Sequence, residues 1–138
     1  MWPEFIHHLT LHFAIVLPMV MAAIGTYAVR ANQKALIPLL RWGGWITLVL
    51  TAITVIAGVA AGGLSGGEEV LKHHRYLGIL TAAVVVLAAI SFEQGVRRKI
   101  EDLRTFSVAM WWTASFSVIG AGHWGTLGEH ADVIPGLF

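Results

Sequence analysis

Four apolar segments, each long enough to cross a bilayer, constrain this chain more than any other feature of its sequence. A transmembrane helix needs about 20 predominantly apolar residues, because the hydrocarbon core of a bilayer is about 30 Å thick. Soluble domains carry about 25% charged residues, whereas this chain carries 12% and has a mean hydropathy of +0.73. The sequence therefore predicts an all-α integral membrane protein with spans at about residues 3–29, 39–63, 70–92 and 103–124.

The connections between these segments are short, and neither an internal repeat nor a domain boundary interrupts the chain. Short connections place consecutive helices side by side in opposite directions. We therefore predict one domain over residues 1–138, folded as an antiparallel, up-down four-helix transmembrane bundle.

The basic residues are distributed unequally between the two ends of this predicted bundle. Seven of them lie in or beside the first and third connections, and only Lys72 and Arg75 lie at the other end. Cytoplasmic loops of membrane proteins carry an excess of Lys and Arg. The pattern predicts a multi-pass membrane protein whose first and third connections lie in the cytoplasm and whose two termini both face outward. The seven are Arg30, Lys34, Arg41, Arg97, Arg98, Lys99 and Arg104.

All seven histidines fall at the predicted outer end, where the first and third segments begin and the fourth one ends. Ionisable groups inside a membrane cost free energy, and they mark functional sites by default. We take six as candidates to bind a cofactor: His7, His8, His12, His74, His123 and His130.

Helical spacing separates these candidates, because residues three and four apart share a face. His8 and His12 share one face, with His12 about 6 Å deeper at 1.5 Å rise per residue. His74 precedes a stripe of small residues typical of a helix–helix interface, whereas His73 precedes a bulky stripe typical of a lipid-facing surface. We therefore predict that the metal ligands come from His12, His74 and His123.

Two chemistries fit such a cluster in a chain without cysteine, which excludes thiolate sites and covalent haem attachment through C-x-x-C-H. In the first, two imidazoles ligate the iron of haem b, with one haem or two in the bundle. Such ligation leaves no open coordination position and suits electron transfer. In the second, three or four imidazoles hold copper or zinc. In a third interpretation the histidines only line the interface of a structural subunit.

Two motifs carry a resemblance to the small bacterial membrane proteins known as domain of unknown function 2231. The run from His7 to Ile15 resembles the pattern H-P-x-x-x-H-F-P-I-A, with His8 and Ala14 at the two proline positions. The run from Gly122 to Ala131 resembles G-H-x-G-G-x-L-V-Y-x-H-G, with a shorter interval to the last histidine. The resemblance implies a four-helix protein of the bacterial inner (plasma) membrane, with histidines and both termini on its outer, periplasmic side, associated with cytochromes and respiratory components. It favours haem over zinc.

These observations predict a membrane electron-transfer protein, alone or as a small subunit of a redox complex. Bis-histidine haem makes it a non-catalytic carrier rather than an enzyme, and no serine lies in a nucleophile-elbow context. The expected partners are the lipid bilayer, cytochrome or other redox subunits, and a quinone. The chain has no basic patch with interleaved aromatic residues, so we expect no nucleic acid.

Overall fold

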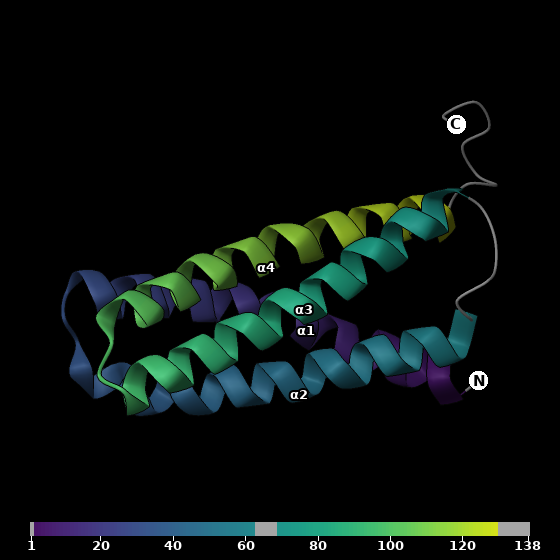
Figure 1. Cartoon of the computed structure of the whole chain (residues 1–138). Helices are drawn as coiled ribbons and strands as arrows, with labels where there is room; N and C mark the ends of the chain where they lie inside the picture. Colours follow the sequence, from purple (N-terminus) through teal and green to yellow (C-terminus); the bar gives the residue numbers. More distant parts are fainter. Residues whose placement is uncertain (1, 63–68, 130–138) are drawn as a thin grey trace.

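The described residues of the computed structural model, 2–62 and 69–129, form four long α-helices and no strand. This confirms the prediction of an all-α chain with four helices. Successive helices alternate in direction, so the start of α1 and the end of α4 lie at the same end of the bundle (Figure 1). The elements are α1 (Trp2–Arg30), the short 3₁₀ helix η1 (Lys34–Leu36), α2 (Ile37–Gly62), α3 (Glu69–Arg97) and α4 (Glu101–Glu129).

Two helices extend beyond the apolar segments that predicted them. Helix α3 continues to Arg97, and α4 begins at Glu101 with a second acid, Asp102, in its first turn. Acids at a helix start and a basic residue at its end both interact favourably with the helix dipole, which explains why these charged turns stay helical. Residue 63, the predicted turn at 66–67 and His130 lie outside the described residues.

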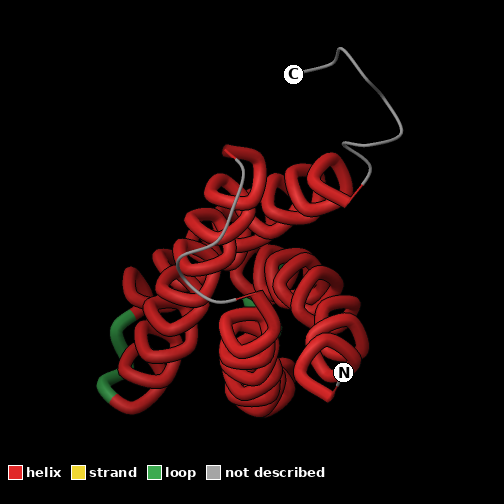
Figure 2. Tube along the Cα trace, turned by 90° about the vertical axis from the view of Figure 1, so that its right-hand side faces the viewer, coloured by secondary structure: helices red, strands yellow, loops and turns green. Residues whose placement is uncertain are grey.

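The helices form two closely packed pairs, α1 with α2 and α3 with α4. The two pairs diverge toward the end where α1 begins, as Figures 1 and 2 both show. We call this the histidine end, and we call the opposite end, where α1 leads into α2 and α3 into α4, the basic end. Trp111 of α4 is only 1% exposed and packs in the core, where its ring lies beside Gly44 of α2.

Among the residues that the structure describes, three stretches are long and apolar enough to cross a membrane: Trp2–Arg30, Lys34–Ala61 and Lys72–Arg97. The fourth predicted span is not among them, because serine and threonine lower the hydropathy of α4. Several of these hydroxyls are satisfied within the protein. Ser115 donates to the carbonyl of Trp111 at 2.8 Å, and Ser107 donates to that of Ala88 in α3 at 2.7 Å. Such hydrogen bonds are what polar groups need at membrane depth.

An ion cluster around the buried carboxylate of Glu93 joins α2 to α3 at the basic end. The carboxylate of Glu93, whose side chain is 8% exposed, accepts two hydrogen bonds from Arg41, at 2.8 and 2.9 Å. It accepts a third from Nε of Arg97 at 2.6 Å. A bidentate arginine–carboxylate pair constrains both distance and orientation, so this cluster sets how α2 and α3 meet.

Glu93→Gln is expected to destabilise the protein by about 2 kcal/mol, because it removes the charge that two arginines share in a buried position. This corresponds to a fall in Tm of roughly 5 °C, measured by thermal unfolding of the purified protein. Glu101→Gln is the matched control. Glu101 is 81% exposed and its ion pair is with Arg104, so the Glu101→Gln variant is expected to change stability by less than about 0.5 kcal/mol. Equal Tm values for the two variants would contradict the structural role of Glu93.

Candidate histidine site

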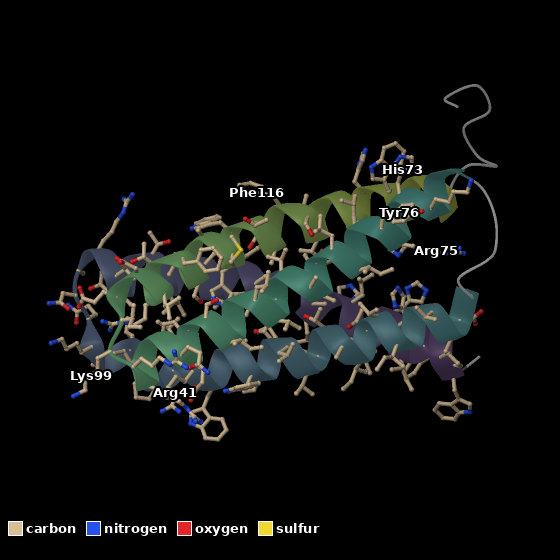
Figure 3. The ribbon with its side chains drawn as sticks, in the orientation of Figure 1. Arg41, His73, Arg75, Tyr76, Lys99 and Phe116 are labelled. Atoms are coloured by element: carbon tan, nitrogen blue, oxygen red, sulfur yellow. The ribbon has the colours of Figure 1, made fainter. Side chains whose placement is uncertain are left out.

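The six described histidines all lie at the histidine end, as the sequence predicts, because α1 and α3 begin there and α4 ends there. Figure 3 shows His73 at this end together with Arg75 and Tyr76, far from Arg41 and Lys99 at the basic end. Six imidazoles are therefore confined to one end of the protein, but their surroundings differ.

His7 of α1 and His74 of α3 are the two described histidines that face each other between helices. Both are half-buried. Their ring centroids are 6.2 Å apart and their planes are nearly perpendicular, at 81°. The pair thus bridges the two helix pairs at the end where these pairs diverge.

Each of these two rings is oriented by a backbone carbonyl of a neighbouring helix. His7 Nδ1 lies 2.9 Å from the carbonyl oxygen of Thr54 in α2, and His74 Nδ1 lies 2.7 Å from that of Ala121 in α4. A carbonyl oxygen only accepts, so Nδ1 must carry the proton and donate it. In the neutral ring, Nε2 then keeps a free lone pair. Metal-ligating histidines are commonly oriented in this way.

The helical stripes explain why these two histidines point inward. Along α1, buried residues recur at Thr10, Ala14 and Pro18, and His7 lies on the same stripe one turn before Thr10. Along α3, His74 precedes Thr81, which is 2% exposed on the predicted inward stripe. Small residues on both stripes let the helices approach, so the first side chain of each stripe meets the neighbouring helix.

Two glycines leave space beside these rings. A Cβ on Gly58 of α2 would lie 2.8 Å from His7 Nδ1, so only glycine lets this ring lie against α2. A Cβ on Gly78, one turn after His74 in α3, would meet nothing within 4 Å. The site is therefore closely packed behind His7 and open beside His74.

His12, which the sequence places deepest along its helix and predicts as a metal ligand, does not face the other helices. His12 is exposed, and its Nδ1 donates to the carbonyl of His8 in its own helix at 3.0 Å. It lies beside Phe13, which is 51% exposed, and opposite the buried stripe of α1. His8 is also exposed, and its ring centroid is 5.7 Å from that of His7.

His73 and His123 form a second group, around Trp124 of α4. Both are exposed, as the bulky stripe predicts for His73. The His73 ring stacks on that of Trp124 at a centroid distance of 4.8 Å, and the His123 ring meets the edge of Trp124 at 6.3 Å. These contacts tie α3 to α4 on the outer surface of the bundle.

Within residues 2–62 and 69–129, no three side chains among His, Cys, Asp and Glu converge to hold a metal ion. The expected ligand set of His12, His74 and His123 is therefore not gathered into a metal site. At this end of the bundle, the described histidines brought together between the helix pairs are His7 and His74. His74 was selected because it shares a helix face with small residues. The same rule, applied to α1, would have identified His7 from the sequence.

Comparisons with protein-family models, curated proteins and solved structures found no match for this chain. The resemblance to domain of unknown function 2231 stays a prediction that rests on its two histidine motifs.

Proposed function

We propose that this chain is a membrane electron-transfer protein that binds haem b through His7 and His74. The observation that carries the proposal is this pair of half-buried imidazoles on two helices. Each ring has Nδ1 hydrogen-bonded to a carbonyl, which leaves Nε2 available as a ligand.

The number of available ligands supports haem over copper or zinc. Structural copper and zinc sites need three or four protein ligands, and the described residues hold no such group. A porphyrin supplies four iron ligands itself, so haem needs only two imidazoles from the protein.

The separation of the two rings also supports the proposal. A ring nitrogen binds a first-row metal at about 2 Å, which places the ring centroid roughly 3 Å from the metal. A centroid distance of 6.2 Å would therefore allow His7 and His74 to hold one metal ion between them. The open space at Gly78 and the divergence of the two helix pairs are consistent with a planar macrocycle at this end (Figures 1 and 2).

In this proposal all four helices span the bacterial inner membrane. The exposed surfaces of all four helices are rich in large apolar side chains, among them Val16 of α1, Ile56 of α2, Leu87 of α3 and Phe116 of α4. The hydroxyls of α4 that are hydrogen-bonded internally make this helix compatible with lipid. The excess of basic residues supports an orientation with the basic end in the cytoplasm and the histidine end in the periplasm.

A haem with two imidazole ligands takes up and releases single electrons without binding a substrate at iron. The chain therefore acts as a carrier, alone or as a subunit of a redox complex, and it exchanges electrons with another cytochrome subunit or a quinone. Its residues supply the two ligands, fix their orientation and exclude water from the core side of the site.

An absorption spectrum of the purified wild-type protein tests this proposal. We expect a Soret band with resolved α and β bands after reduction, and a pyridine haemochrome characteristic of haem b. A colourless protein carrying stoichiometric copper or zinc would show that the histidines bind a different metal. A colourless protein without metal would leave only the interpretation in which the histidines line the interface of a structural subunit.

A further inference from the structure

A cavity of about 190 Å³ lies at the basic end, where the end of α1 and the start of α2 meet α3 and α4. We call it the basic-end pocket. Asn32 adopts a left-handed conformation (φ 48°) after α1 and turns the chain into η1, which brings Gln33 and Lys34 to the pocket. The pocket is separate from the histidine site, which lies at the other end of the bundle.

The lining of the pocket combines two kinds of surface. Its apolar part includes Leu40 and Phe92, which belong to the hydrophobic core and are 3% and 5% exposed. Its polar part includes Gln33, Lys34 and Arg104. An amphipathic lining of this kind fits a molecule that is charged at one end and apolar at the other.

Arg104 gives the pocket an unsatisfied donor. Its side chain is 21% exposed, and one terminal nitrogen donates to Glu101 Oε1 at 3.1 Å. Its Nε is buried and has no hydrogen-bond partner among the described residues. A buried donor without an acceptor is costly, so an acceptor bound beside Arg104 would be favourable. The stem of Arg104 packs against Gly95, where a Cβ would lie 2.8 Å from Arg104 Cγ.

The charge around the pocket favours an anionic acceptor. Seven of the nine Lys and Arg residues of the chain lie at the basic end, and two of them, Lys34 and Arg104, line the pocket. Glu101 is an acid in the lining, and its carboxylate is paired with Arg104. Basic pockets between transmembrane helices are typical binding sites for anionic lipid headgroups.

We propose that the basic-end pocket binds the phosphate of an anionic phospholipid, with Arg104 and Lys34 donating to its oxygens. The apolar lining then faces the glycerol backbone and the start of the acyl chains. A free phosphate ion would use the same two cations but would gain nothing from Leu40 and Phe92, so the lining favours the lipid. The proposal is independent of the proposed haem.

Lipid binding to the full-length protein in detergent tests this inference, with phosphatidylglycerol, phosphatidylcholine and inorganic phosphate as three separate probes. Binding is followed by native mass spectrometry and by the rise in Tm with added lipid. For the wild type we expect phosphatidylglycerol to bind at least tenfold more tightly than phosphatidylcholine. Inorganic phosphate is expected to raise the Tm little. Equal binding of the two lipids, or an equal effect of phosphate alone, would overturn the proposal.

Three variants locate the site. Lys34→Gln and Arg104→Gln are each expected to weaken phosphatidylglycerol binding about fivefold or more, since one basic side chain near an anionic headgroup contributes roughly that factor. Lys99→Gln is the matched control, because Lys99 is exposed at the same end but does not line the pocket (Figure 3). Lys34 is itself exposed, so its variant reports binding even where Arg104→Gln lowers the yield of folded protein. If Lys99→Gln and Lys34→Gln weaken phosphatidylglycerol binding equally, the effect comes from the overall charge of the basic end. That result would overturn the proposed site.

Discussion

His7→Ala and His74→Ala are each expected to lower haem content by about 100-fold at limiting haem, whereas His12→Ala retains it. Loss of a group that only orients a metal ligand already costs about 10- to 100-fold in affinity, and these variants remove a ligand itself. The measurement is the pyridine haemochrome per mole of purified protein. His12→Ala is the matched control, because His12 lies in the same helix as His7 but is exposed and bonded to its own helix.

Comparing the three variants distinguishes the loss of an iron ligand from a general effect of replacing histidines at the histidine end. Retention of haem in His7→Ala together with its loss in His12→Ala would assign the ligand to the outer face of α1 and overturn the pair. Size-exclusion profiles of all three variants establish that they are equally folded.

Gly58→Ala is expected to weaken haem binding by about 10- to 100-fold although residue 58 contributes no ligand atom. The added Cβ would lie 2.8 Å from Nδ1 and 2.9 Å from Cε1 of His7, closer than such atoms approach. The ring would have to move and lose its hydrogen bond to the carbonyl of Thr54. Removing a hydrogen bond that orients a metal ligand lowers metal affinity by about this factor. Haem titration of the apoprotein measures the effect.

Gly122→Ala is the control for Gly58→Ala, since its Cβ would meet its nearest neighbour, Ile15, at an ordinary 4.0 Å. It is expected to bind haem within about twofold of the wild type. Equal affinities for Gly58→Ala and the wild type would contradict a role for the oriented His7 ring. Unchanged Tm values in both variants would show that the loss is local to the site.

Hydropathy and connection length were sufficient to predict the four helices, because three of them have a long apolar segment at their centre and the fourth has a predominantly apolar one interrupted by serine and threonine. The helix ends were less well predicted. The charged turns around Arg97 and Glu101 are helical although they lie outside the apolar segments, and hydropathy carries no information about helix dipoles. The cluster of Glu93 with Arg41 joins residues 52 positions apart, and a single sequence does not indicate such a pairing.

The orientation of α3 was predictable because small residues follow His74 at helical spacing, and the burial of Thr81 and Val85 confirms this inward face. For α1 the prediction relied on the depth of His12 in the segment. Depth along a helix does not determine which way a side chain points, and near a helix end an amphipathic side chain reaches the interface from the outer face. The stripe of Thr10, Ala14 and Pro18 carries the needed signal, and it selects His7.

The electron paramagnetic resonance spectrum of the oxidised wild-type protein tests the ligand pair most directly, because it reports the axial ligands of the iron. Two imidazoles at the haem iron predict a low-spin ferric signal that becomes high-spin, or disappears with the haem, in both His7→Ala and His74→Ala. The account predicts an unchanged low-spin signal in His12→Ala. A high-spin wild-type signal, or a low-spin signal that survives in His7→Ala or His74→Ala, would contradict ligation by this pair.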